Sequence, residues 1–257
     1  MTRTTHRAAG LLIAIAAVAL APHEAGATAT THIWSPATDV QKYGTLHVTE
    51  DLWVPDGPGA AGARLPTVTN LGLTGGVLPW RNLNLEVGVD HKTGYGPLDA
   101  YPWYFNAKLG VPEDGPARGI PALAAGILDV GTQSRATDDD VLYVAAAKTL
   151  GPLGRLSVGW FSGNDQLLRD ADGKADNSGI MLAWERTMPE ISDRLWLCVD
   201  YMGTKSAYGT LSFGGAWKFA DNVAILAGYA MQNESRLFPN TVTIQADVDF
   251  GLGGGGK

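Results

Sequence analysis

Cysteine is almost absent from this chain of 257 residues, which contains only Cys198. A single thiol excludes an internal disulfide framework and a cysteine-based zinc site, and it is best interpreted as one small apolar side chain. Basic residues are scarce as well, with 19 Lys and Arg against 26 Asp and Glu, for a net charge of −7. Because no basic patch offsets that charge, nothing favours binding to a nucleic-acid backbone. We expect no nucleic-acid partner.

Long apolar runs are also lacking. The run from residue 11 to residue 20 is well short of the roughly 20 apolar residues that a transmembrane helix needs. It follows two arginines and precedes Ala25-Gly26-Ala27, which is the order of parts in a secretory signal peptide. We expect residues 1–27 to be removed after export. If the remaining chain enters a membrane, it must do so as strands that close on themselves, since an open sheet edge leaves backbone groups unpaired in hydrocarbon.

Period-two alternation is what the chain has in abundance. In residues 82–90 leucine and valine occupy the odd positions, whereas polar residues and glycine occupy the even ones. Residues 103–111 and 241–250 alternate in the same way. Such segments have about the ten residues that a tilted strand needs to cross a bilayer. The pattern predicts an all-β protein, a transmembrane antiparallel up-and-down β-barrel.

About twelve strands are expected, an even number, as in single-chain bacterial barrels. The barrel would span residues 44–251, with strands at 44–54, 65–78, 82–91, 102–111, 120–131, 141–150, 155–163, 178–188, 194–204, 208–218, 223–232 and 240–251. Tight turns would face the periplasm together with both termini, and longer polar loops would face outward. The short link 205–207 and the long link 112–119 depart from that rule.

Large aromatic residues fall toward the two ends of the predicted strands, as two interfacial girdles would require. One set comprises Trp80, Trp184, Trp217 and Phe250, and the other comprises Trp53, Trp103, Trp160 and Tyr201. A soluble β-sandwich or lipocalin-like barrel would also alternate apolar and polar residues. There the apolar face points inward, whereas here the polar face carries small Gly and Ala and the apolar face is large and aromatic, which favours the membrane barrel.

With these features, the chain resembles the small outer-membrane β-barrel proteins of Gram-negative bacteria, including uncharacterised porin-like ones. The resemblance covers most of the chain, and residues 33–41 and 103–108 look like family signatures. It implies the bacterial outer membrane as location, with outer-membrane lipids and lipopolysaccharide as partners. Many such barrels end on an aromatic residue, whereas here Phe250 is followed by a Gly-rich tail, 252–257.

The polar faces of the strands would line the lumen. The predicted lining residues are Glu86, Asp90, Lys108, Glu185, Asp200, Asp247 and Asp249, with Lys148, Arg155, Arg194 and Lys218 as further basic members. Both signs of charge suit either a selective channel or internal bridges in a closed barrel. Residues 28–43 contain Pro36 and do not alternate, and we interpret them as a periplasmic lead-in or a small plug.

No convincing catalytic constellation is found, and we expect no catalytic residue, no cofactor and no metal site. The pattern that comes closest to an outer-membrane phospholipase is His91-Lys92-Thr93 with Asn106. There Thr replaces the nucleophilic Ser, and strand parity places His91 and Asn106 on opposite faces. The acidic loop 164–177 and Asp138-Asp139-Asp140 are interpreted as solvated loop tips, with weak divalent-cation binding as the alternative.

The sequence therefore predicts a narrow porin-like channel or a transport protein for a small solute. Twelve strands lie between the eight that side chains can fill and the sixteen that leave an aqueous channel. Two alternatives stay open: an enzyme that modifies lipid or lipopolysaccharide, and a closed structural barrel.

Overall fold

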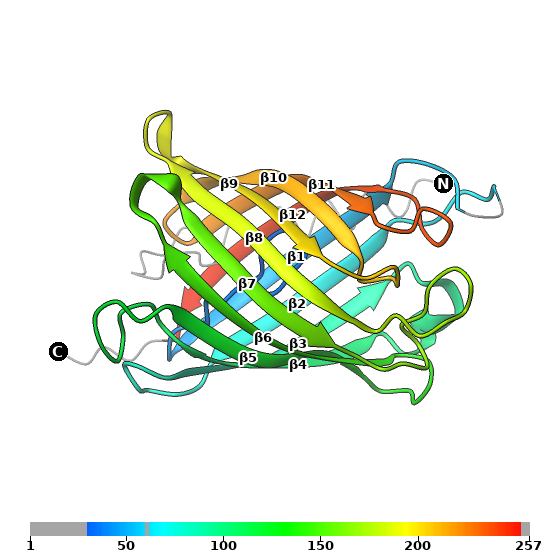
Figure 1. Ribbon diagram of the computed structural model, residues 1–257, viewed down its shortest axis with the longest axis horizontal. Helices are drawn as coiled ribbons and strands as arrows, with labels where there is room; N and C mark the ends of the chain where they lie inside the picture. Colours follow the sequence, from blue (N-terminus) through cyan, green and yellow to red (C-terminus); the bar gives the residue numbers. More distant parts are fainter. Residues whose placement is uncertain (1–29, 60–61, 253–257) are drawn as a thin grey trace.

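The described part of the chain consists almost wholly of strands that follow one another around a closed ring (Figure 1). The computed structural model describes residues 30–59 and 62–252, so the predicted signal peptide and nearly all of the Gly-rich tail lie outside these residues. The strands are β1 (Thr45–Pro55), β2 (Val68–Gly76), β3 (Asn84–Thr93), β4 (Trp103–Val111), β5 (Ala122–Gly131), β6 (Asp138–Thr149), β7 (Arg155–Ser162), β8 (Ser178–Met188), β9 (Ser192–Met202), β10 (Thr210–Ala220), β11 (Val223–Gln232) and β12 (Thr241–Gly251).

Closure of the ring removes the open edge. β1 pairs with β12 along its whole length, from Thr45 opposite Gly251 to Pro55 opposite Thr241, and with β2 on its other side. All neighbouring strands are antiparallel and consecutive in the sequence. The predicted all-β, up-and-down barrel of twelve strands is confirmed. Every strand thus has a hydrogen-bonded neighbour on both sides, which a sheet needs if it is to lie in hydrocarbon.

The strand limits differ from the predicted ones by three residues at most, at the start of β2 (68 instead of 65) and of β6 (138 instead of 141). The earlier start of β6 corrects the placement of Asp138-Asp139-Asp140, which lies in a strand and not in a loop tip. β5 and β6 shift register between Leu128 and Val130, and Asp129 and Asp140 adopt positive φ values of 55° and 47°. These bulges break the strict alternation on which the predicted limit depended.

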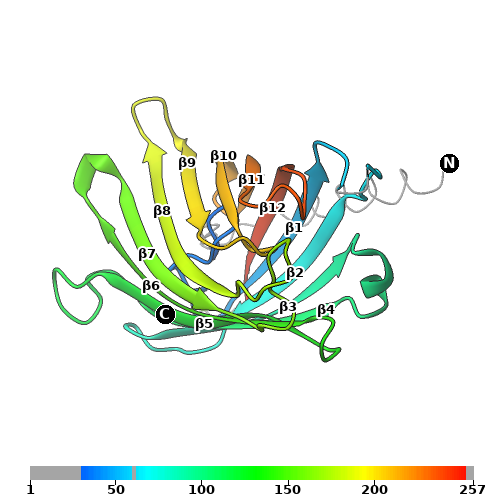
Figure 2. The ribbon, with the colours of Figure 1, turned by 45° about the vertical axis from the view of Figure 1, so that its right-hand side comes forward.

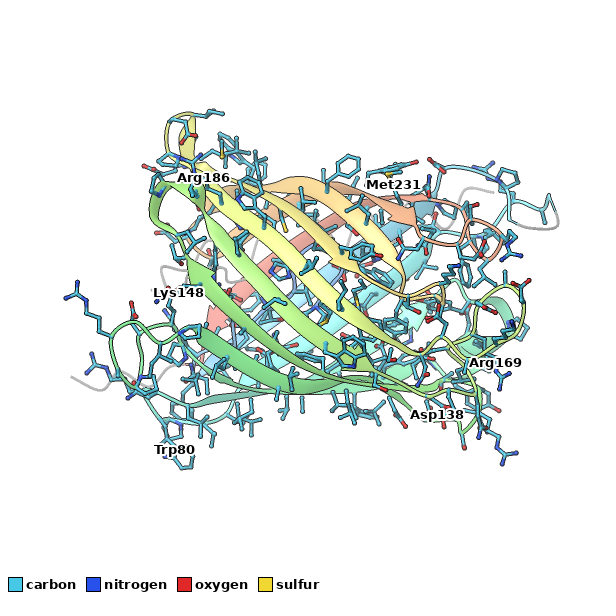
Figure 3. All side chains as sticks on the ribbon, viewed as in Figure 1. Trp80, Asp138, Lys148, Arg169, Arg186 and Met231 are labelled. Carbon is cyan, nitrogen blue, oxygen red and sulfur yellow. The ribbon has the colours of Figure 1, made fainter. Side chains whose placement is uncertain are left out.

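The two ends of the barrel differ in their connections. One end, called the turn end here, has the links 77–83, 112–121, 150–154, 189–191 and 221–222. The other, the loop end, has the links 56–67, 94–102, 132–137, 163–177, 203–209 and 233–240. Figure 3 shows Trp80, Lys148 and Arg186 at the turn end and Asp138 and Arg169 at the loop end. As predicted, the link after β4 is long for its end of the barrel.

The outer surface is apolar along the middle of the strands. Val158 in β7 is 57% exposed, and Leu142 and Val144 in β6 are 60% and 57% exposed. The same belt continues around the ring through Leu71, Leu73, Val87, Phe105, Leu109, Leu156, Trp160, Ile180, Leu182, Phe213, Ile225 and Ile244. An exposed apolar surface of this extent is stable against lipid and not against water. No helix among the described residues is long and apolar enough to cross a membrane.

Candidate functional site: the barrel interior

Residues 30–43, called the inner segment here, run inside the barrel, where Figure 2 shows them as the dark blue stretch between opposite walls. A tight turn begins the segment: Thr31 bridges to Pro36, and the N–H of His32 donates to the carbonyl of Ser35 over 2.8 Å. The side chains of Ile33, Ala37 and Gln41 are only 1–2% exposed. Between His32 and Gln41 the segment is therefore largely buried, although it has no regular secondary structure.

Asp200 of β9 holds the turn of the inner segment. Its carboxylate accepts the backbone N–H groups of Ile33 at 2.8 Å and of Trp34 and Ser35 at 3.1 Å each. From β12, the side-chain amide of Gln245 donates to the carbonyl of Ile33 at 2.8 Å. Buried backbone groups need such partners, and hydrogen bonds to a carboxylate are among the stronger ones. The wall thus supplies the hydrogen bonds that the segment cannot make within itself.

An ion-pair cluster from β7 and β8 holds the middle of the inner segment. Arg155 contacts Asp39 of the segment at 2.7 Å and Glu185 of β8 at 3.4 Å. Its second nitrogen donates to the hydroxyl of Thr38. Glu185 also accepts the indole N–H of Trp196 at 3.0 Å. Arg155 thus pairs with one carboxylate of the wall and one of the segment, so that the segment is tied to β7 and β8.

A second ion pair, from β3 and β4, contacts the inner segment both at its start and near its end. Lys108 and Glu86 lie 3.1 Å apart, and both are buried. The ammonium group of Lys108 donates to the carbonyls of Thr30 and Asp39, and the carboxylate of Glu86 accepts the N–H of Gln41 at 2.8 Å. A buried ion pair is stabilising only when its remaining donors and acceptors are satisfied. Here the inner segment satisfies them.

Glycines on the wall make room for the inner segment. A Cβ atom at Gly110 of β4 would lie 2.5 Å from a methyl carbon of Val40. One at Gly76 of β2 would lie 2.0 Å from the carbonyl oxygen of Lys42, so that the backbone itself would have to move. Glycine in a strand often marks such a close approach of another chain segment. The wall is therefore shaped to the segment as well as bonded to it.

The predicted lining residues divide into two groups. Glu86, Lys108 and Asp200 contact the inner segment as described above, and Glu185 lies 3.8 Å from the ring of His32. Asp247 and Asp249 instead flank His47 of β1, at 3.3 and 2.6 Å, and Asp90 accepts a hydrogen bond from Asn106 at 2.8 Å. All seven thus take part in contacts between strands or with the segment. That they line the path of a solute stays a prediction.

Two sequence-based assignments to faces are wrong. Lys148 was expected in the lumen, but it lies at the turn end and pairs with Glu113 and Asp114 of the link after β4. Trp53 was expected in an outer aromatic girdle, but its ring packs edge-on against Trp34 of the inner segment, 4.9 Å between centroids. In both cases the partner of the side chain lies outside its own strand, in the link after β4 or in the inner segment, so the strand pattern alone does not show it. The alternation signal at Lys148 was weak because β6 is rich in alanine.

Asp129 and Tyr208 are interior residues that the sequence did not reveal. The hydroxyl of Tyr208, in the link after β9, donates to Asp129, which also pairs with Lys92 of β3. Parity alone would turn Asp129 away from the interior, because Leu128 packs inward. The bulge with its positive φ turns the carboxylate back. A bulge in an alanine-rich strand leaves no sequence signal strong enough to predict it.

The residues of the phospholipase-like pattern lie apart. His91 packs against Trp103 with ring centroids 4.8 Å apart, whereas Asn106 bonds to Asp90 in the interior. In the loop 163–177, an oxygen of Asp170 accepts the N–H groups of Asp172 and Lys174, both at 2.9 Å. Within residues 30–59 and 62–252, no group of three His, Cys, Asp or Glu residues lies in a metal-binding arrangement. Divalent-cation binding by this loop stays a prediction.

Histidine 32 gives the inner segment a predicted pH dependence. Burial lowers the pKa of His32 from 6.5 to about 4, against the opposing attraction of Asp39, with Arg155 and Lys108 adding to the lowering. Glu185 lies 3.8 Å from its ring. When the segment is displaced or unfolded, His32 becomes protonated as the pH falls below 6.5. In the packed segment it stays neutral until the pH falls to about 4. The packing of the segment is thus at full strength above pH 6.5 and weakens as the pH falls through this window.

We expect the inner segment to be displaced more often at pH 5 than at pH 7.5. Cys198 packs beneath Ile33, so the rate at which a maleimide labels this thiol reports displacement of the segment. The ratio of the rates for wild type and His32→Gln, measured at each pH, removes the intrinsic pH dependence of the thiol. A ratio that stays constant between the two pH values would contradict the prediction.

Comparison with known proteins gives likeness in architecture only. No family model matches the chain, and no curated protein is similar to it in sequence. Among solved structures, an outer-membrane channel from Pseudomonas putida F1 is similar over 82% of this chain and 97% of its own, with 12% identity and a TM-score of 0.49. The KdgM porin is similar over 79% and 98%, with 8% identity and a TM-score of 0.49. A mutant of the Rh. blastica porin is similar over 80% and 99%, with 9% identity and a TM-score of 0.42.

Proposed function

We propose that the protein is a narrow porin-like channel of the bacterial outer membrane, in which the inner segment closes the lumen and moves aside for small solutes. The observation that carries the proposal is the convergence of charged and polar side chains from β3, β4, β7, β8, β9 and β12 on this one segment. Outer-membrane lipids and lipopolysaccharide would surround the apolar belt.

The chemistry of the interior favours a channel over a closed structural barrel. Burying a charge costs several kcal/mol even when the charge is paired, and apolar side chains of similar volume would fill a barrel at least as stably. A wall of Asp200, Glu86, Lys108 and Arg155 has another property: it is compatible with water once the segment leaves. The contacts of the inner segment are therefore of the kind that water can replace, which a removable closure needs.

Recording of ionic current across planar bilayers tests the proposal. Ile33 and Cys198 belong to one buried cluster, so Ile33→Cys offers the native thiol a disulfide partner that ties the inner segment to β9. We expect rare, small openings for the wild-type barrel. For Ile33→Cys, openings should be absent under oxidising conditions and should return when dithiothreitol is added.

A matched control keeps this experiment specific. Ile33→Cys combined with Cys198→Ala has no disulfide partner and should open under both conditions. Heat-modifiable migration in gels shows in each case that the barrel is folded. Folded wild-type and reduced Ile33→Cys barrels that never conduct would overturn the proposal and favour a closed structural barrel. Openings that persist in the oxidised, cross-linked protein would show that the inner segment is not the closure.

A further inference from the structure

The link 203–209 at the loop end folds into the barrel, and several of its side chains are buried there. Thr204, Ser206 and Tyr208 are 5%, 2% and 7% exposed. Asn233 of a neighbouring loop donates to the carbonyls of Met202 and Thr204 at 2.8 and 2.9 Å. Tyr208 also belongs to a buried apolar cluster with Val141, Tyr143, Phe161, Leu168, Met181 and Met202. The link is thus fixed in an inward position by both polar and apolar contacts.

Tyr208 crosses the lumen to the opposite wall. Its hydroxyl donates to Asp129 of β5 and lies 3.4 Å from Asp139 of β6. In the ring order, β6, β7, β8 and β9 stand between β10, which follows Tyr208, and β5. Asp129 is held in turn by Lys92, whose ammonium group lies 5.0 Å from the ring centroid of Tyr104. A contact between two nearly opposite walls obstructs the lumen at that level.

Trp34 connects this obstruction to the inner segment. Its indole N–H donates to the carbonyl of Tyr208 at 3.1 Å, and the two ring centroids are 6.1 Å apart. On its other side Trp34 packs against Trp53 of β1. The backbone N–H of Trp34 is one of the three that Asp200 accepts. Trp34 therefore belongs to the inner segment and at the same time contacts Tyr208 of the link 203–209.

We infer that the link 203–209 is a second closure of the barrel and that Trp34 couples it to the inner segment, so that releasing Tyr208 from Asp129 also loosens the segment. Two parts that share a contact lose stability together when either is displaced. The coupling can be measured on the folded barrel without any solute. That the two coupled parts act as two gates of one channel rests on the proposed function.

Maleimide labelling of Cys198 tests the coupling, because this thiol is covered by Ile33 and belongs to a different buried cluster from Tyr208. Tyr208→Phe keeps the ring against Trp34 and removes only the hydroxyl. A hydrogen bond to a charged group contributes enough that its loss should raise the labelling rate about tenfold. In a Trp34→Ala background, where the connection is already cut, Tyr208→Phe should change the rate little.

A matched control is available in Tyr229, whose hydroxyl donates to Asp56 outside the barrel. Tyr229→Phe removes the same kind of hydrogen bond and should leave the labelling rate of Cys198 unchanged. Trp34→Phe, which keeps a ring but loses the indole N–H, serves if Trp34→Ala does not fold.

The possible outcomes separate the inference from the proposed function. Unchanged labelling in Tyr208→Phe would overturn the coupling, and so would an equal acceleration in Tyr229→Phe, which would indicate general loosening. An additive effect of Tyr208→Phe in the Trp34→Ala background would overturn it too. Accelerated labelling in Tyr208→Phe alone supports the coupling, and it does so even if none of the variants conducts, a result that would contradict only the channel.

Discussion

Val158→Arg should lower the free energy of unfolding of the barrel by about 2–4 kcal/mol, the cost of a lipid-facing arginine near the bilayer midplane. Val158 lies in the middle of β7, and its neighbours on the adjacent strands are Ala146 and Leu182. Its surroundings on the outer face are therefore apolar, with no carboxylate among these cross-strand partners. Urea unfolding in lipid vesicles, followed by tryptophan fluorescence, measures the change.

Leu153→Arg is the matched control for this prediction. Leu153 ends the short 3-10 turn Gly151–Leu153 at the turn end and is 70% exposed. The same introduced arginine should cost at most about 1 kcal/mol there, because its side chain reaches water near the interface. Equal effects of the two substitutions would mean that the middle of β7 does not face lipid. A barrel that stays soluble and monomeric without detergent would contradict the membrane assignment altogether.

Asp200→Ala should release the inner segment. The substitution leaves three backbone N–H groups without their acceptor, and each unsatisfied group costs about 1–3 kcal/mol, reduced to the extent that water replaces the carboxylate. With a net loss of about 3 kcal/mol, the maleimide labelling rate of Cys198 should rise about a hundredfold. The barrel itself should remain folded, because its strand ladders do not depend on the segment.

Two further variants make this prediction specific. Asp200→Asn keeps one carbonyl oxygen as an acceptor and should give an intermediate labelling rate. Asp193→Ala removes an exposed carboxylate from the same strand, near its start, and should leave the rate at the wild-type value. A rate for Asp200→Ala that equals the wild-type rate would show that the three hydrogen bonds do not hold the segment in place.

Strand positions and ring closure followed from local patterns. Alternation such as that in β3, β4 and β12 requires one apolar and one polar face, and segments of about ten residues match the thickness of a bilayer. Both are properties of neighbouring residues in the sequence, so they can be read without knowing any distant contact. The same local logic placed Lys148 on the wrong face, because the alanines of β6 have no strong preference for either environment.

What the amino-acid sequence by itself determined is therefore the barrel: the number of strands, their order, and the apolar surface toward lipid, since each strand carries its own two-faced pattern. Only the tertiary structure decided how the interior is filled. The inner segment has no periodicity to reveal its position, and the place of Trp34 depends on Asp200 and Tyr208, in and after β9, and on Trp53 of β1. The inward turn of Asp129 depends on a bulge. Contacts between opposite walls exist only after the ring has closed, and so no local pattern encodes them.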